Sequence, residues 1–290
     1  MTDVRKRLIH LHMCPAMSRS LLHSIIRVDP ELLNIYDCSL SFLQNHINLP
    51  IKKAQTIHAY LKSSSPDSCL KYLSSIHVFP LTYLDSDYPT LLKEIYDPPF
   101  VLYGMGHRGI IQSKKNLAII GSRSPTSTGS QTVAKLIPAL SKQGLTIVSG
   151  FAKGIDSIAH WKTIQTSGRT MAILGSGHLH MYPKENVQLF SQMSKNQLIL
   201  SEYPPDTPPQ KWHFPARNRI ISGMSKGVLV IEAKEKSGSL ITADQALEQG
   251  RDVYAIPGSI FSPLSKGTNY LIQQGAKLVM SAEDILEDFQ

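Results

Sequence analysis

Over residues 1–76, apolar positions recur every three or four residues, which is the spacing of short amphipathic helices. The clearest examples are residues 31–46 and 51–62. Pro50 and the Ser- and Pro-containing stretch 63–68 punctuate these helices, and the whole region contains no glycine. The pattern therefore predicts a small all-helical domain over residues 1–76.

Beyond this region, short β-branched runs alternate with helical stretches. The runs that predict strands are 117–120, 145–150, 170–177, 198–203, 227–233, 252–258 and 277–280. Helices are predicted at 129–143, 155–167, 185–196, 214–224, 239–249, 267–274 and 282–289. Because buried strands that alternate with helices are typical of a parallel sheet covered on both faces, residues 77–290 are predicted to form a doubly wound α/β domain.

Two local features modify this picture. Residues 81–106 predict a strand-containing segment that leads into the sheet. Pro138 lies inside the first predicted helix of the α/β domain, where a proline removes a backbone hydrogen bond and predicts a kink or a break.

Composition places the chain among ordinary globular proteins, with 42% hydrophobic and 18% charged residues. No apolar run approaches the length that spans a bilayer, and the basic residues near the N-terminus are not followed by a signal-peptide core. Cys14, Cys38 and Cys69 are odd in number and widely spaced, so we expect neither a disulfide framework nor a zinc cluster. We expect a reduced, cytoplasmic protein with no membrane partner.

Positive charge is concentrated in the α/β region. The net charge of the chain is +8, and the segment from Arg108 to Lys277 holds 20 Lys and Arg against 9 Asp and Glu. Such a surplus favours a polyanionic partner, although a generically basic surface is the alternative interpretation.

Small, donor-rich loops follow four of the predicted strands, and ligands of doubly wound sheets bind at this edge. Glycine lets a backbone approach a phosphate, N–H groups at a helix start suit an anion, and an arginine can bind phosphate bidentately. Many such turns use Gly and Ser only to turn, but four together favour a shared anion-binding rim. The predicted rim residues are Gly121, Ser122, Arg123, Gly150, Lys153, Gly175, Ser176, Lys184, Asn186, Ser237 and Gly238.

A basic cluster at the start of a later helix has two interpretations. Arg217 could contact phosphate directly, or the cluster could pin its helix to the sheet through an ion pair with Glu202 or Glu232. Asp156 could act as an acid or base, yet it also suits the first turn of a helix. The sequence leaves these alternatives open, and we assign no catalytic residue.

Other ligand classes lack their motifs. The first turn is not G-x-G-x-x-G and no acid ends the second strand, so a nicotinamide cofactor is not expected. The P-loop motif for ATP is missing as well. His178 and His180 lie two apart without HExxH or a Cys/His pair, so no metal site and no cofactor are predicted.

Five strings together resemble one family: SGFAKGIDSIAH, AILGSG with YPKEN, SEYPP with FPARNRIISGMS, EAKEKSGSLITADQALEQGRDVYAIPG and KGTNYLIQQGAKLV. They are similar to the DNA-processing protein A family (DprA, also called Smf), in order over roughly residues 80–281. The helical region before them is similar in size to the family's N-terminal SAM-like domain. The sequence ends soon after 277–280, so the C-terminal winged-helix domain of some relatives is not expected.

The resemblance implies an extended Rossmann fold that binds single-stranded DNA. It further implies a homodimer that protects incoming strands in natural transformation and loads the RecA recombinase onto them, without enzymatic activity. Arg123 and Lys184 correspond to family DNA-binding residues. Asn269, Ile272 and Leu278 correspond to the dimer surface.

Bases could stack on Tyr182, Phe151 or Trp212, although each could equally be structural. An enzyme is the rival hypothesis, because related phosphoribohydrolases carry a catalytic glutamate in the corresponding loop. This chain has Gln245 at that position, which leaves the acid–base role without an occupant. A structural adaptor that recruits partners through residues 1–76 is a third hypothesis and is compatible with DNA binding.

Overall fold

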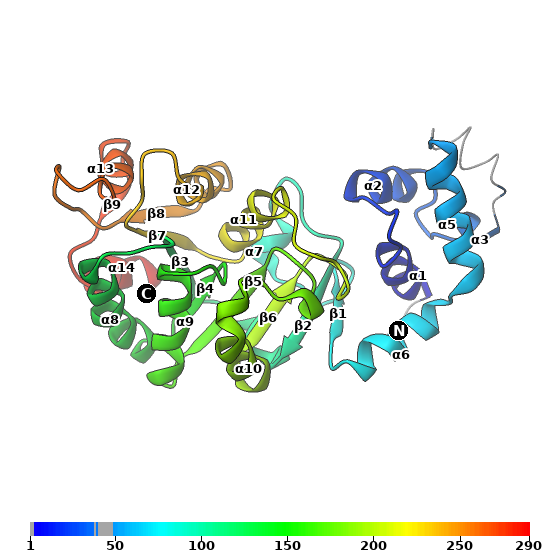
Figure 1. Ribbon diagram of the computed structural model, residues 1–290, viewed down its shortest axis with the longest axis horizontal. Helices are drawn as coiled ribbons and strands as arrows, with labels where there is room; N and C mark the ends of the chain where they lie inside the picture. Colours follow the sequence, from blue (N-terminus) through cyan, green and yellow to red (C-terminus); the bar gives the residue numbers. More distant parts are fainter. Residues whose placement is uncertain (1–2, 38, 40–48) are drawn as a thin grey trace. The chain divides into compact units, whose positions relative to one another are not determined.

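The chain forms two compact units in the computed structural model, which describes residues 3–37, 39 and 49–290. The first unit comprises Met1–Asp85 and Phe100–Leu102, and the second comprises Ser86–Pro99 and Tyr103–Gln290. Figure 1 shows the first unit in blue and cyan and most of the second in green to red.

The first unit is built mainly of short helices. They are α1 (Asp3–His12), α2 (Arg19–Val28), α3 (Asn34–Asp37), α5 (Ile51–Ser63) and α6 (Pro66–Ser75), followed by strand β1 (Phe79–Thr82). Side chains cap two of them: Ser18 accepts from the N–H of Leu21, and Ser65 and Ser68 form a reciprocal capping box. Of the helix predicted over 31–46, residues 34–37 are helical, while residue 38 and residues 40–48 lie outside the described residues.

The second unit alternates strands and helices as predicted. Its strands are β2 (Val101–Gly106, which begins in the first unit), β3 (Asn116–Gly121), β4 (Thr146–Ser149), β5 (Arg169–Leu174), β6 (Leu198–Ser201), β7 (Gly227–Ile231), β8 (Asp252–Ala255) and β9 (Lys277–Leu278). Its α-helices are α7 (Thr90–Lys93), α8 (Ser127–Lys142), α9 (Ile155–Gln165), α10 (Val187–Asn196), α11 (His213–Gly223), α12 (Gly238–Glu248), α13 (Lys266–Gln273) and α14 (Glu283–Leu286). Short 3₁₀ helices are η1 (Arg108–Gln112), η2 (His178–His180), η3 (Lys184–Asn186) and η4 (Glu287–Phe289).

These strands form a sheet in the order β2-β6-β5-β4-β3-β7-β8-β9. Neighbours from β6 to β9 are parallel, and β2 runs antiparallel to β6. In Figure 1, α8, α9 and α10 lie along one side of the sheet, with α11 and α12 on the other. The predicted doubly wound, mostly parallel, Rossmann-like α/β fold is confirmed.

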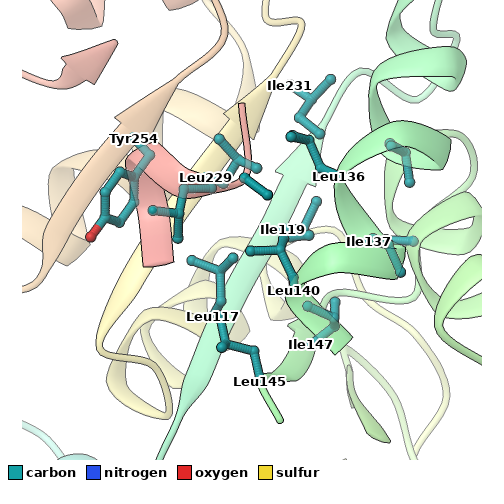
Figure 2. Packing of buried hydrophobic residues seen from close by; sticks show 14 of the residues in the cluster. Leu117, Ile119, Leu136, Ile137, Leu140, Leu145, Ile147, Leu229, Ile231 and Tyr254 are labelled. Atoms are coloured by element: carbon teal, nitrogen blue, oxygen red, sulfur yellow. The ribbon is translucent and has the colours of Figure 1, made fainter. Parts of the chain in front are cut away.

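The central strands are apolar on both faces because helices cover both. In Figure 2, Leu117 and Ile119 of β3 pack with Leu229 of β7 and Ile147 of β4. Helix α8 contributes Leu136, Ile137 and Leu140 to the same fully or almost fully buried cluster. This core fixes the ends of β3, β4 and β7, from which the loops of the site emerge.

Helix α8 is continuous through Pro138, so the predicted break does not occur. Leu136 and Ile137 precede the proline, Leu140 follows it, and all three are buried in the core. Packing on both sides of the proline therefore maintains the helix where its local propensity is poor.

Cys14 and Cys69 are buried free thiols, while Cys38 lies outside the described residues. Within the described ranges, no helix combines the length and the apolar character that crossing a bilayer requires.

His160 of α9 makes the stability of the second unit depend on pH. Its Nδ1 lies 2.6 Å from Thr170 Oγ1, its Nε2 is buried without a hydrogen-bond partner, and burial lowers its pKa from 6.5 to about 3. Below pH 6.5, His160 therefore binds a proton in the unfolded chain but stays neutral in the folded chain. The contribution of His160 to the free energy of unfolding is complete above pH 6.5. It is lost by about 1.4 kcal/mol per pH unit as the pH falls below that value.

We predict that His160→Gln flattens the fall in unfolding free energy between pH 6.5 and pH 5. Urea titrations followed by tryptophan fluorescence measure it, since Trp161 and Trp212, the only tryptophans, both belong to the second unit. His180→Gln, at an exposed histidine, is the control and should keep the wild-type slope. Equal slopes for His160→Gln and the wild type would contradict the prediction.

Candidate functional site

A pocket of about 900 Å³ opens at the carboxyl ends of β3 and β7. The chain leaves β3 toward β4 on one side, while β7 lies on the other, so this is the point where the strand order reverses. Ligands of doubly wound sheets bind at such switch points. Its walls come from the loop after β3, the start of α11, the loop between β7 and α12, and residues 262–264.

The loop after β3 forms the first wall. At Gly121, a Cβ atom would lie 1.9 Å from the carbonyl oxygen of Ile231, so only glycine allows β3 and β7 to approach this closely. Ser122 Oγ accepts a hydrogen bond from the N–H of Ser124 at 3.1 Å. Arg123, between them, is exposed and lines the pocket. The predicted residues Gly121, Ser122 and Arg123 are thus brought together at the pocket.

The loop between β7 and α12 forms the second wall. Ser239 Oγ donates to the carbonyl oxygen of Gly121 at 3.2 Å, which ties the two loops together. Ser237 precedes α12, and its buried hydroxyl has no hydrogen-bond partner within the described chain. Gly238 is exposed beside open space. Ser237 and Gly238 both line the pocket, so the start of α12 offers hydrogen-bond donors there.

Arg217 of α11 and Asp156 of α9 form a buried pair at the base of the pocket. Arg217 Nη1 donates to the carbonyl oxygen of Gly150 at 2.5 Å and to that of Ile173. Asp156 Oδ2 accepts from the N–H groups of Gly150 and Ala152 at 3.1 and 3.3 Å. The pair therefore holds the ends of β4 and β5 in place.

Burial opposes ionisation of both members of this pair. It raises the pKa of Asp156, against the attraction of Arg217, and it lowers the pKa of Arg217 to about 10, against the attraction of Asp156. A Cβ at Gly150 would lie 2.7 Å from Arg217 Nη2 and 2.8 Å from Asp156 Oδ2. Gly150 is thus enclosed by Arg217 and Asp156 and does not line the pocket.

The ion pair with Glu202 that the sequence offers for the basic cluster is made by Arg219. Arg219 binds both carboxylate oxygens of Glu202 at 2.7 and 2.9 Å, and it binds Asp97 at 2.5 Å. Glu232 contacts neither arginine within the described chain. Its carboxylate instead accepts from Thr126.

The loop after β4 contributes an ion pair beside the pocket. Lys153 Nζ lies 2.5 Å from Glu185 Oε1, and both side chains are more than half exposed. Lys184, at the start of η3, is exposed, while Asn186 is buried and donates to the carbonyl oxygen of Phe151 at 2.9 Å. None of these predicted residues lines the pocket.

The loop after β5 is packed against the protein itself. A Cβ at Gly175 would lie 2.8 Å from the ring of Phe214. Ser176 is buried and donates to the carbonyl oxygen of His180 at 2.8 Å. Gly175 and Ser176 thus support Phe214 and the η2 segment, and they too lie outside the pocket lining.

Sequence reasoning missed three contributors to the pocket. Lys211 and Lys234 are exposed lysines of its lining, and Phe214 is one of its aromatic rings. Phe214 pairs with Tyr182, with ring centroids 5.5 Å apart. Lys234 stands in a string that the sequence analysis quotes, and Lys211 lies between two such strings, but a linear pattern does not show which lysine faces a pocket.

The two other aromatic candidates lie elsewhere. Phe151 is fully buried in a core cluster with Leu174 and Leu189, so its ring is not available to a base. Trp212 is 68% exposed and is not part of the pocket lining.

The residues predicted at a dimer surface lie on α13 and β9. Both amide atoms of Asn269 bind the backbone of Gly258, at 3.1 and 2.9 Å. Ile272 is half-buried, and Leu278 on the edge strand is 40% exposed.

The described residues contain no group of three or more His, Cys, Asp or Glu side chains that could hold a metal ion. His178 is buried, its Nε2 lies 3.3 Å from the carbonyl oxygen of Ile199, and burial lowers its pKa to about 4. The neighbouring His180 is exposed.

Comparisons with known proteins agree on one family. The family model described as DNA recombination-mediator protein A matches residues 79–290. DNA processing protein DprA of Bacillus subtilis is 51% identical over 213 residues, which cover 73% of this chain and 71% of that protein. Protein Smf of Escherichia coli is 41% identical over 245 residues, covering 83% of this chain and 64% of that protein.

Solved structures give the same result. The X-ray structure of DNA processing protein A from Streptococcus pneumoniae has a TM-score of 0.85 and 36% identity, covering 100% of this chain and 99% of that one. A structure of DNA processing protein A from Helicobacter pylori, described for its single-stranded DNA binding mode, has a TM-score of 0.67 and 30% identity, covering 73% and 95%. This chain therefore belongs to the DNA recombination-mediator protein A family, the family that its sequence strings resemble.

Proposed function

We propose that the chain binds single-stranded DNA with the pocket at the ends of β3 and β7. The charge of the pocket lining carries this proposal. Arg123, Lys211 and Lys234 are exposed there, and in the described part of the chain none of them has an ion-pair partner. The one acid of the lining, Asp156, is buried against Arg217. The opening therefore presents positive charge suited to a phosphate backbone.

Aromatic rings beside these cations favour a single strand over a duplex. Single strands are held by cationic grooves combined with rings on which unpaired bases stack. Tyr182 and Phe214 supply such rings in the pocket lining. Lys184 lies outside the pocket lining but follows Tyr182 by two residues and is exposed. This supports a role for Lys184 as a phosphate contact beside the pocket, in addition to Arg123. The Helicobacter relative, described for its single-stranded DNA binding, supports the same ligand.

Family membership supports a wider role in DNA processing during natural transformation. We propose that the chain protects incoming strands in the cytoplasm, acts as a homodimer and loads the RecA recombinase. We also propose that it is not an enzyme. In this chain Gln245 stands where the rival phosphoribohydrolases carry glutamate, and Gln245 does not line the pocket.

We predict that Arg123→Glu and Lys184→Glu each weaken binding of a labelled oligo-dT about tenfold, because each replaces a phosphate contact with a repulsive charge. Fluorescence anisotropy at two or more salt concentrations measures this, and the salt slope should fall by about one per lost contact. Lys142→Glu is the matched control, since this exposed lysine ends α8 far along the helix from the pocket.

The melting temperatures of all three variants should match that of the wild type. Oligo-dT binding that stays at wild-type strength in both Arg123→Glu and Lys184→Glu would place the DNA elsewhere. Failure of the wild-type protein to bind oligo-dT would contradict the proposed function itself.

We predict that Arg217→Met lowers the unfolding free energy by about 3 kcal/mol, because it leaves Asp156 and two backbone carbonyl groups without their partner in a buried site. Thermal unfolding measures the loss. If Arg217 only positions the strand ends, the salt slope of oligo-dT binding, measured where the variant is folded, should equal that of the wild type. A slope smaller by about one would assign Arg217 a direct phosphate contact instead.

We predict that Leu278→Asp converts a dimer into monomers, because it places a charge on the exposed edge strand β9 that we assign to the interface with Asn269 and Ile272. Light scattering measures the molar mass. Leu247→Asp, at an exposed leucine of α12, is the control and should remain dimeric. A Leu278→Asp variant with the wild-type mass would move the interface to another face.

A further inference from the structure

A carboxylate of the protein lies at the start of α8, where it is bonded to Thr126, a residue of the pocket lining. Glu232 follows β7, and its Oε2 accepts a hydrogen bond from the backbone N–H of Thr126 at 2.9 Å. Its Oε1 accepts a second one from the hydroxyl of Thr126. Thr126 is the N-cap residue of α8, and its Oγ1 also accepts from the N–H of Gly129 at 3.1 Å. Two N–H groups at the positive end of this helix, those of Thr126 and Gly129, are therefore bonded from within the chain.

This arrangement is a capping box made across the fold. In the local version, a Glu or Gln at the third helical position reaches back to the N–H of the N-cap residue. Here the third helical position is Gly129, which has no side chain, and Glu232 takes the role from 106 residues away. A Cβ at Gly129 would lie 2.6 Å from the carboxyl carbon of Glu232. The glycine thus makes room for the carboxylate.

Glu232 adopts an uncommon backbone conformation to reach this place. Its φ is +55°, in the left-handed region that non-glycine residues seldom occupy. The flanking backbone is fixed on both sides: Ile231 pairs with Gly121, and the N–H of Ala233 donates to the carbonyl oxygen of Leu264 at 2.6 Å. Strain of this kind persists where the surrounding structure enforces it, and it is found more often at functional sites than elsewhere.

The position is the one that ligands occupy in related architectures. In dinucleotide-binding folds, the pyrophosphate sits at the N-terminus of the helix after the first strand of the βαβ unit, which corresponds to α8. In this chain the same helix end already holds a negative charge. A ligand phosphate there would find the N–H groups of Thr126 and Gly129 already bonded and would meet a like charge.

We infer that Glu232 is an internal anion that takes the place of a ligand phosphate at the start of α8 and thereby makes the pocket select against free nucleoside phosphates. Phosphates of a longer strand bind instead to the cations of the rim, Arg123, Lys211 and Lys234. The inference rests on the proposed function only for this choice of rim contacts. The exclusion of small phosphates stands on the geometry of Glu232 alone.

The test is direct binding of inorganic phosphate and of AMP, measured by isothermal titration calorimetry at constant ionic strength. Glu232→Gln keeps an acceptor for the N–H of Thr126 while removing the charge, and Glu232→Ala also vacates the space. We expect both variants to bind phosphate and AMP at least about tenfold more tightly than the wild type. Glu235→Gln is the matched control, because it removes the same charge from an exposed position of the same loop.

Three outcomes would overturn the inference. Phosphate and AMP affinities in Glu232→Gln that equal those of the wild type would show that the carboxylate blocks nothing. An equal gain in Glu235→Gln would reduce the effect to overall charge. Tight AMP binding by the wild type would show that the site is open.

Two further measurements distinguish a failure of this inference from a folding defect and from a failure of the proposed function. Glu232→Gln decides the matter if Glu232→Ala melts at a markedly lower temperature. Oligo-dT binding by the wild type reports on the proposed function independently, since its failure leaves the phosphate affinities of the variants to be measured in the same way.

Discussion

The close approach of β3 and β7 at their carboxyl ends is the constraint on which the site depends. Gly121 and Ile231 are paired in the register, and no side chain larger than hydrogen fits at Gly121. This contact brings together two loops that are more than a hundred residues apart in sequence, and Ser239 fixes them by its bond to Gly121. Because both loops are anchored at their first residues, their donors and Arg123 face one pocket.

Buried charge performs a different task below this surface. Asp156 and Arg217 bind the backbone of neighbouring strand ends and attract each other, and burial works against the charge of both. Such a pair contributes little net stability but penalises any rearrangement that separates its members. Arg219 and Glu202 do the same for α11. The exposed cations of the pocket therefore lie above buried residues whose charges, in Asp156 with Arg217 and in Glu202 with Arg219, are already balanced by each other.

The strand and loop pattern could be predicted because it follows local rules. Apolar runs gave the strands, and the carboxyl-end rule gave Gly121, Arg123 and Ser237 as pocket residues. What the pattern did not distinguish is which polar side chains turn inward. From the sequence, Ser176 is expected to bind a ligand, yet its hydroxyl donates a hydrogen bond to the backbone carbonyl of His180 in its own loop. Lys211 lies far from any predicted strand end, so only the folded chain shows that it reaches the pocket.

Glu232 shows the same limit most clearly, because its sequence context indicates only an acid after a strand. Its partner Thr126 lies in another loop, and the empty side-chain position that admits it belongs to Gly129. With the start of α8 occupied by a carboxylate of the protein, the pocket keeps the dispersed cations of its rim and the hydrogen-bond donors at the start of α12. Dispersed cations bind a chain of single charges better than one compact, multiply charged phosphate, because each phosphate of a strand can meet its own cation. The internal carboxylate and the positive rim are thus two parts of one preference for a polymer over a mononucleotide.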